Sequence, residues 1–280
     1  MMNNESSDAD VKVSVVIPVY NMAEYVGESI RSALNGGLES VEVIVIDDGS
    51  TDDTRSVVEA YTNRAHPRYD ERVRYEYQTN RGKSAAVNRG LEIARGSYVA
   101  MLDADDRIPP SGLSSRFEAR FDEHGRSCDL VIGGFGVFGP DGRQGNRSAP
   151  SMKDPWRLHN RFYLSLKTPF HLNACLVSRS LVKKVGALDE SLHRCIDGDY
   201  ALRVLKGAES VNTVDEIVYL YRKHRTSPLE RVKYRLKTAR YRPQVVWRNY
   251  DGWRRWVAVP FALVMDTGKL AFELVRSYKS

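Results

Sequence analysis

Hydrophobic and polar positions alternate with two different periods along the first hundred residues. Four short apolar runs rich in β-branched residues predict strands, at 13–19, 41–47, 73–78 and 98–103. Three intervening segments repeat their apolar positions at the helical period, at 24–34, 52–64 and 84–95. Strands alternating with helices predict a parallel sheet of right-handed βαβ units that is buried on both faces.

Polar residues follow each of these strands directly. They are Tyr20 and Asn21 after the first, Asp47 to Ser50 after the second, residues 80–84 after the third and Asp103 to Asp106 after the fourth. Ligands of parallel sheets bind beyond the carboxyl ends of the strands. We therefore expect these side chains to line one crevice.

The pattern becomes mixed beyond residue 110. It predicts helices at 111–123, 154–166, 180–185 and 198–206, and extended segments at 129–138, 173–178 and 211–221. From residue 229 the chain turns into basic helical stretches. The whole pattern predicts the α/β class with a C-terminal helical extension.

Charge is unevenly distributed along the 280 residues. The chain has a net charge of +6, but residues 229–280 hold twelve Lys or Arg against four acidic residues, so the first 228 residues carry −2. The composition, 42% hydrophobic and 28% charged, excludes disordered and collagen-like classes. An acidic-to-neutral body with a basic end indicates a docking surface and argues against a nucleic-acid partner.

The sequence carries no signal for export or for a membrane span. No apolar run approaches the roughly 18 residues of a spanning helix, and the first ten residues lack the basic and apolar regions of a secretory signal. Three scattered cysteines form neither a zinc nor a disulfide framework. These features predict a cytoplasmic protein.

The run Asp103-Ala-Asp105-Asp106 is the sharpest chemical signal. Three carboxylates in four residues repel one another unless they are solvated or bridged by a cation, and Mg²⁺ and Mn²⁺ prefer oxygen ligands. The run predicts a site for a metal and a diphosphate, and the alternative is a solvated acidic turn. Asp47 and Asp48 could accept hydrogen bonds from a base or a ribose, whereas Ser50 or Thr51 could simply cap a helix.

Six co-linear segments resemble glycosyltransferase family two. They are VVIPVYN at 15–21, VIDDGSTD at 45–52, NRGKSAAVNRG at 80–90, LDADD at 102–106, VGALDESL with DGDYALR between 185 and 203, and YRKHRTS at 221–227. The resemblance implies a GT-A fold with a Rossmann-like, mostly parallel sheet flanked by helices. It also implies inverting transfer of a sugar from a nucleoside diphosphate, usually UDP, to a hydroxyl of a glycan or lipid-linked acceptor.

The same resemblance implies roles for single residues. The nucleotide sugar would contact Pro18, Tyr20, Asp48, Asn80, Lys83, Asn88, Asp103, Ala104, Arg222 and Ser227. Asp105 and His224 would bind a divalent cation, Mn²⁺ or Mg²⁺. A cation and Lys or Arg side chains near the leaving diphosphate stabilise the charge that develops there.

Asp197 is the predicted general base, because an ordinary Asp is ionised at neutral pH and can accept the acceptor hydroxyl's proton. Two alternatives stay open: Asp197 could cap a helix that begins at Gly198, and Asp199 could be the base instead. The sequence also departs from the family pattern. Val87 stands where many members have Arg, Ile196 stands where an acidic residue is common, and the Gln-x-x-Arg-Trp motif of polymerising members is not evident, which favours single additions.

We therefore divide the chain into a flexible N-terminus at 1–11, a catalytic domain at 12–228 and a basic amphipathic tail at 229–280. The catalytic domain has a nucleotide-binding half at 12–110 and an acceptor-binding half at 111–228. Cations and the tryptophans Trp247, Trp253 and Trp256 fit a helix on an anionic membrane face, but the tail could equally pack on the body or form an oligomer contact. The alternative functions are a nucleotidyltransferase and a catalytically inactive nucleotide-sugar-binding protein.

Overall fold

The apolar runs of the sequence form the strands of one sheet, seen in a computed structural model that describes residues 11–140, 142–165, 170–224, 227–252, 256 and 259–260. The expectation of a flexible N-terminus at 1–11 thus lies outside the described residues, apart from Val11. The parts of the predicted tail at 253–255, 257–258 and 261–280, with Trp253, also lie outside them.

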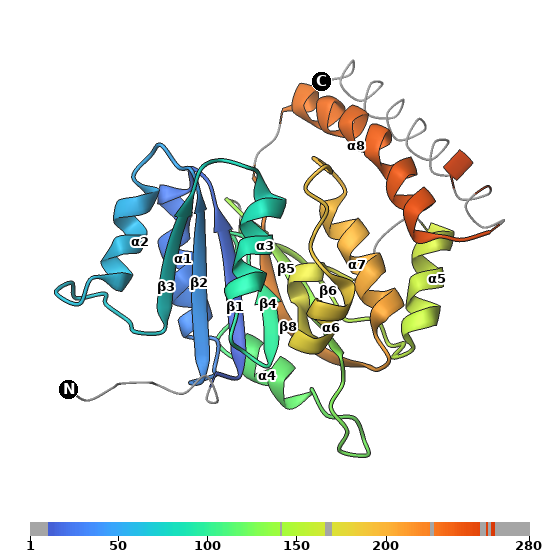
Figure 1. The fold of residues 1–280 in the computed structure, drawn as a ribbon, viewed down its shortest axis with the longest axis horizontal. Coiled ribbons are helices and arrows are strands. Elements are labelled where there is room, and N and C mark those ends of the chain that lie inside the picture. The colour runs from blue at the N-terminus through green and yellow to red at the C-terminus, as the bar shows by residue number, and fades with distance from the viewer. Residues whose placement is uncertain are drawn as a thin grey trace.

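Eight strands of the described chain form the sheet (Figure 1). They are β1 (Val13–Val19), β2 (Val41–Asp48), β3 (Val73–Gln78), β4 (Tyr98–Met101), β5 (Leu130–Gly139), β6 (Gly142–Arg147), β7 (Cys175–Ser178) and β8 (Val211–Arg222). The order is β3-β2-β1-β4-β7-β5-β6, and β8 pairs with β5. The pairings of β1 to β4 and of β5 with β8 are parallel, whereas β6 and β7 run antiparallel to their neighbours.

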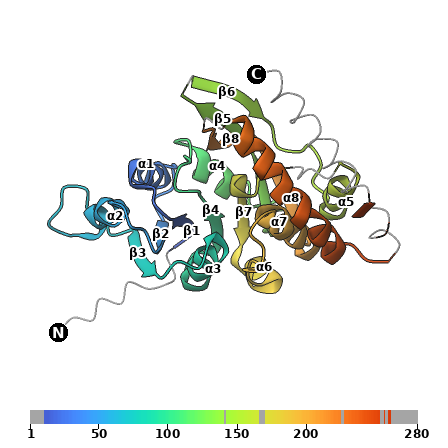
Figure 2. The same cartoon turned by 90° about the horizontal axis from the view of Figure 1, so that it is seen from above.

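Helices cover both faces of the sheet (Figure 2). One face carries α1 (Ala23–Leu34), α2 (Thr54–Thr62) and α4 (Gly112–Glu118), and the other carries α3 (Lys83–Ile93), α6 (Arg179–Val185) and α7 (Ile196–Gly207). Two further helices, α5 (Pro155–Ser165) and α8 (Pro228–Asn249), lie beside α7. The mostly parallel sheet flanked by helices confirms the predicted fold class.

Side-chain alternation along the strands produces two hydrophobic cores. In β1, Val13, Val15 and Ile17 face the core under α1, and Val16 faces the core under α3 and α7. All are fully buried, as expected for a central strand with helices on both sides. The sheet passes through both halves that the sequence analysis distinguishes, so the two halves share one framework.

The strand β6 was not predicted. It pairs with the end of β5 across a tight hairpin, and its sequence, GRQGNR, has no apolar alternation. Its glycines Gly142 and Gly145 have φ of +90° and +154°. Because this strand is polar on both sides, hydrophobic periodicity could not reveal it.

Two predicted helix caps are wrong. The helix after β2 begins beyond Asp53, so neither Ser50 nor Thr51 caps it. The helix α7 begins at Ile196, so Asp197 lies inside its first turn and does not cap a helix starting at Gly198. Its N-cap, Cys195, has a left-handed backbone with φ of 61°. Within the described residues, no helix is long and apolar enough to cross a membrane.

A small residue is required where α3 crosses β1. A Cβ placed on Gly90 would lie 2.3 Å from Cγ1 of the buried Val16. We expect Gly90→Ala to lower the free energy of unfolding by about 1–3 kcal/mol, although at an exposed helix position alanine is more stabilising than glycine. Urea denaturation measures this, and the double variant with Val16→Ala should recover part of the loss. Unchanged stability of Gly90→Ala would contradict the close packing of α3 on β1.

Candidate functional site

The crevice predicted from the polar strand ends is present. A cavity of about 450 Å³ lies beyond the carboxyl ends of β1, β2 and β4, beside the start of α3. Eight of the predicted residues line it: Pro18, Tyr20, Asp48, Asn80, Lys83, Asp103, Ala104 and Asp105. Parallel strand direction brings these loops to one edge, which explains why residues up to 87 positions apart share one cavity.

Asp48 shapes one wall of the cavity by organising the loop before α3. Its Oδ1 accepts hydrogen bonds from the side chain of Gln78 at 2.7 Å and from the backbone N–H of Arg81 at 2.8 Å. Its Oδ2 accepts one from the N–H of Gly82 at 2.8 Å. Asp48 is 3% exposed. A nucleotide sugar bound in the cavity would therefore contact a carboxylate whose position is already fixed by three hydrogen bonds.

Asp47, its neighbour, is fully buried and points into a different network. Its two oxygens accept bonds from the Ser50 N–H and from the Tyr75 hydroxyl. Ser50 and Thr51, in turn, bond to Asn21, which has a left-handed backbone at φ 51°. These polar residues join the loops after β1 and β2, which is the physical reason that they do not cap a helix.

A partly buried ion pair lies at the floor of the cavity, with 37% of the Lys83 side chain and 26% of the Asp103 side chain exposed. Lys83 Nζ, at the start of α3, is 2.7 Å from Oδ1 and 3.0 Å from Oδ2 of Asp103. It is also 3.9 Å from Asp197 Oδ1. Burial alone would lower the pKa of Lys83, but the charges of Asp103 and Asp197 outweigh burial and hold it above its ordinary value. Lys83 is therefore a fixed positive charge.

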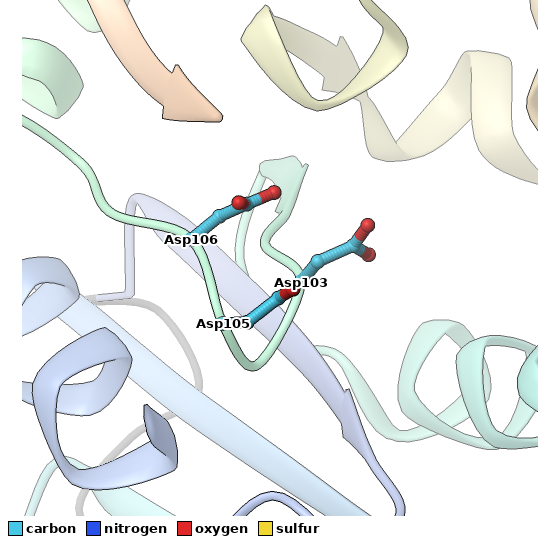
Figure 3. Close-up of side chains that lie close together, drawn as sticks. All are labelled: Asp103, Asp105 and Asp106. Atoms are coloured by element: carbon cyan, nitrogen blue, oxygen red, sulfur yellow. The ribbon is translucent and has the colours of Figure 1, made fainter. Parts of the chain in front are cut away.

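Asp103, Asp105 and Asp106 lie on the loop after β4 (Figure 3). One carboxylate oxygen of each lies within 4.8 Å of the others, a spacing that a single cation could bridge. Burial and the charge of Asp103 raise the pKa of Asp106 to about 8. Its oxygens are committed to the Tyr219 hydroxyl and the Arg222 N–H, and Asp103 is committed to Lys83.

The side chain of Asp105 contacts His224. Its Oδ2 lies 2.7 Å from His224 Nε2, and the two residues come from loops after β4 and β8. The side chain of His224 is 43% exposed and that of Asp105 is 20% exposed. A carboxylate and an imidazole at this separation form a donor set that Mn²⁺ accepts, so the chemistry of the predicted pair fits a divalent cation.

Arg222 reaches the same loop from β8 but is directed into the protein. Its Nε donates to the carbonyl of Asp105 at 2.6 Å, and its guanidinium also pairs with Glu28 of α1. The ring of Tyr25 lies beneath it, 4.8 Å from the guanidinium carbon. Arg222 thus holds the Asp105 loop in place, and its predicted contact with the diphosphate stays a prediction.

The two acidic residues of α7 have different surroundings. The side chain of Asp197 is 53% exposed and lies 3.9 Å from Lys83. The side chain of Asp199 is 5% exposed, pairs with Arg203 at 2.9 Å and accepts a bond from Asn249 of α8 at 2.8 Å. Asp199 therefore joins α7 to α8, and only Asp197 faces the cavity's edge with a free carboxylate oxygen to offer.

Two further predicted donor contacts, like Arg222, lie outside the lining of the cavity. The side chain of Asn88 bonds to the backbone of Leu188 in both directions, at 3.0 and 2.7 Å, and so joins α3 to the segment after α6. Ser227 is the N-cap of α8 and forms a capping box with Glu230. Since both polar groups are used by the protein itself, their contacts with a donor stay predictions.

Sequence reasoning missed His171 and Asn173. They precede β7, whose antiparallel direction places its amino end at the edge where the parallel strands end. Asn173 donates a hydrogen bond to the Tyr219 hydroxyl at 2.9 Å. No motif of the sequence contains these residues, and only the reversed strand direction, which periodicity does not reveal, brings them to the site.

Sequence comparison identifies related glycosyltransferases. The chain is 29% identical over 231 residues to the uncharacterized glycosyltransferase EpsJ of Bacillus subtilis, covering 78% of this chain and 63% of the relative. It is 35% identical over 131 residues to the putative teichuronic acid biosynthesis glycosyltransferase TuaG of the same organism, covering 46% and 49%. The chain thus spans less than two thirds of the length of these relatives.

Solved structures share the fold. A crystal structure of S. aureus TarS 1–349 in complex with UDP-GlcNAc has a TM-score of 0.62 at 21% identity, covering 96% of this chain and 73% of that one. The mannosyltransferase PcManGT from Pyrobaculum calidifontis, in complex with GDP-Man and Mn²⁺, has a TM-score of 0.60 at 22% identity, covering 94% and 75%.

The sequence model of one family, described as glycosyl transferase family 2, matches residues 14–186. This match includes β1 to β4, the loop of Asp103 to Asp106 and the residues that line the cavity. It covers more than half of the chain, which therefore belongs to glycosyl transferase family 2.

Proposed function

We propose that this protein transfers a sugar from a UDP-sugar to a hydroxyl of a glycan or lipid-linked acceptor, with inversion at the anomeric carbon, in the synthesis of a cell-surface polysaccharide or glycoconjugate. One observation carries the proposal: Lys83 lies between Asp103, on the cavity floor, and Asp197, at the cavity edge. A donor in the cavity would therefore have the Lys83 ammonium group near its diphosphate and the Asp197 carboxylate on the side from which the acceptor attacks. The teichuronic acid role in the name of TuaG and the UDP-GlcNAc bound by TarS agree with this donor and product class.

The reaction is a single displacement. The acceptor oxygen forms a bond to the anomeric carbon while the bond from that carbon to the diphosphate oxygen breaks. The electron pair of the broken bond leaves with UDP, and the acceptor proton moves to Asp197. Attack opposite the leaving group inverts the configuration at the anomeric carbon.

Residues from both halves of the catalytic domain would stabilise the negative charge that develops on the leaving diphosphate. Lys83 presents a permanent positive charge in a partly buried position, where electrostatic interactions are stronger than in water. Asp105 and His224 would hold Mn²⁺ or Mg²⁺, which supplies additional positive charge for the diphosphate oxygens when bound. Arg222 and Asp106 keep the loop of Asp105 in the position from which it reaches His224.

A nucleotidyltransferase would also need a nucleotide and a cation, but it releases pyrophosphate from a triphosphate. Screening UDP- and GDP-sugars with Mn²⁺ for release of the nucleoside diphosphate tests the proposal directly. Pyrophosphate release from a nucleoside triphosphate, without release of UDP or GDP from any sugar donor, would reject it. Binding of UDP-sugars without turnover in the presence of acceptor would favour the inactive binding protein.

Asp197→Asn should lower the rate of sugar transfer by about 10²–10⁴-fold, because the amide cannot accept the acceptor proton. UDP binding, measured by calorimetry, should change little, since Asp197 is outside the cavity lining. Asp199→Asn serves as the comparison, because it weakens the contacts with Arg203 and Asn249 and should mainly lower thermal stability. Transfer by Asp197→Asn at a substantial fraction of the wild-type rate would remove Asp197 from the mechanism.

His224→Ala should weaken UDP binding by about tenfold in the presence of Mn²⁺, the scale of one lost charge-assisted contact. Without a divalent cation, the variant and the wild type should bind UDP alike, which calorimetry with EDTA measures. His124→Ala is the matched control, because that histidine is exposed on the loop after α4, 66% of its side chain being accessible. If UDP binding depended on Mn²⁺ equally in His224→Ala and in the wild type, His224 would not be a ligand of the cation.

We also propose that α8 rests on an anionic membrane at its cytoplasmic face. One side of α8 packs on the body through the buried Val245, Val246 and Tyr250. The other side carries Leu229, Leu236, Arg240 and Trp247, which recur at the spacing of one helix face and are exposed. Apolar anchors mixed with cations are typical of interfacial helices, so the tail both packs on the body and offers a basic amphipathic face.

Charge reversal on α8 tests this contact. Replacing Lys233, Lys237 and Arg240 by Glu should lower partitioning to phosphatidylserine-rich liposomes by about two orders of magnitude, at roughly 1 kcal/mol per cation. A variant with Glu at Arg55, Arg68 and Arg126, which are exposed elsewhere, has the same net charge and should partition like the wild type. Equal flotation of all three proteins would reject the membrane contact, and loss of a dimer in the α8 variant would assign this face to an oligomer.

A further inference from the structure

We propose that Phe135, His171 and Tyr221 form a binding face for the terminal pyranose ring of the acceptor, beside Asp197. The proposal rests on the transfer reaction proposed above and names the subsite through which the acceptor enters. These three residues have no place in the nucleotide cavity, and they come from β5, from the segment before β7 and from the end of β8.

Sheet register places the rings together. In the parallel pairing of β5 with β8, Phe135 is opposite Tyr219 and Val137 is opposite Tyr221. Residues two apart on a strand share a face, so Phe135, Tyr219 and Tyr221 project from the same side. His171 lies against them, with ring centroids 5.2 Å from Phe135, 4.9 Å from Tyr219 and 5.9 Å from Tyr221.

This aromatic group is not closed to solvent. Tyr219 is fully buried and supports the group from below, whereas Tyr221 is 39% exposed and both Phe135 and His171 are partly exposed. His171 Nδ1 is buried and has no hydrogen-bond partner among the described residues. A buried polar atom without a partner costs free energy, so a rotation of the partly exposed imidazole that brought this nitrogen to a ligand hydroxyl would be favourable.

A chain of contacts joins the face to the reacting groups: the His171 ring stacks on Tyr219, whose hydroxyl bonds to Asp106. On the same loop, Asp103 pairs with Lys83, which lies 3.9 Å from Asp197. Burial lowers the pKa of His171, and the negative charges of Asp197 and Asp103 oppose that shift only in part. At neutral pH the ring is therefore uncharged, with one nitrogen donating and the other accepting. Asp197 must receive a proton from the acceptor, so an acceptor ring seated on this face would present its hydroxyl where the proton is taken.

Sugar chemistry matches the face better than other ligands do. A pyranose has an apolar C–H surface that packs on aromatic rings and a rim of hydroxyls that seek hydrogen bonds, and this face combines exposed aromatic carbon with an unpartnered imidazole nitrogen. The donor would occupy the cavity that Asp103 lines, and none of the three residues of the face lines that cavity. The ring that remains to be seated here is therefore the acceptor's.

Tyr221→Leu tests the face without disturbing a buried side chain. The probes are octyl β-glycosides of glucose, galactose, mannose and N-acetylglucosamine, and binding is measured by saturation-transfer NMR, which needs no turnover. Wild-type protein should transfer saturation to the ring C–H protons of at least one glycoside. Tyr221→Leu should weaken that binding by about tenfold, the scale of one aromatic contact, and Tyr221→Phe should retain it.

Phe121→Leu is the matched control, because Phe121 is 42% exposed and its carbonyl bonds to Asn212, near the first residue of β8, at the opposite end of that strand. It should bind the glycosides like the wild type. His171→Gln, which retains a hydrogen-bonding group, should bind more tightly than His171→Ala. Equal binding by wild type and Tyr221→Leu, or absence of binding by every glycoside, would overturn the proposal.

Kinetics separate this subsite from the donor site. Tyr221→Leu should raise the acceptor KM by about tenfold, while the KM for the UDP-sugar and the rate of its hydrolysis by water stay within about twofold of wild type. Parallel losses in donor KM and hydrolysis would instead assign the face to the donor sugar and overturn the acceptor assignment. Failure of the wild type to release UDP would reject the proposed transfer reaction, whereas the NMR comparison still decides whether the face binds sugar.

Discussion

The site depends on the ion pair between Lys83 and Asp103. It joins the first residue of α3 to the loop after β4, and it places the same ammonium group within 3.9 Å of Asp197 at the start of α7. Three elements from both halves of the chain thus share one positive charge. The partly buried ammonium is stabilised by its two carboxylate partners, so folding and the position of the proposed base are coupled through this contact.

A second network joins the two halves on the other side of the cavity. The buried Asp106 binds the Tyr219 hydroxyl and the Arg222 N–H, while Arg222 reaches Glu28 of α1. Tyr219 belongs to this network through its hydroxyl and to the aromatic face through its ring. The proposed cation site of Asp105 and His224 and the proposed acceptor face of Tyr221 therefore both depend on the end of β8, which would link the proposed donor chemistry with acceptor binding.

The first half of the fold and most of the donor cavity could be predicted from sequence, because buried parallel strands read as apolar runs and their polar ends must meet at one edge. Asp103, Asp105 and Lys83 were found in this way. Hydrogen-bond partners could not be predicted: nothing in the spacing shows that Asp199 pairs with Arg203 or that Ser227 caps α8. The polar strand β6 and the loop of His171 leave no periodic trace, since neither alternates apolar and polar residues.

The late position of β8 in the chain has a consequence for synthesis on the ribosome. Asp105 and His224 are separated by 119 residues, and β8 pairs with β5 only after the whole intervening segment has emerged. Until then, Asp106 and Glu28 lack their partners from β8. The cavity residues from β1 to β4 can come together early in translation, but Asp105 meets His224 only after residue 224 has emerged. A nascent chain stalled before that point would therefore carry an incomplete crevice.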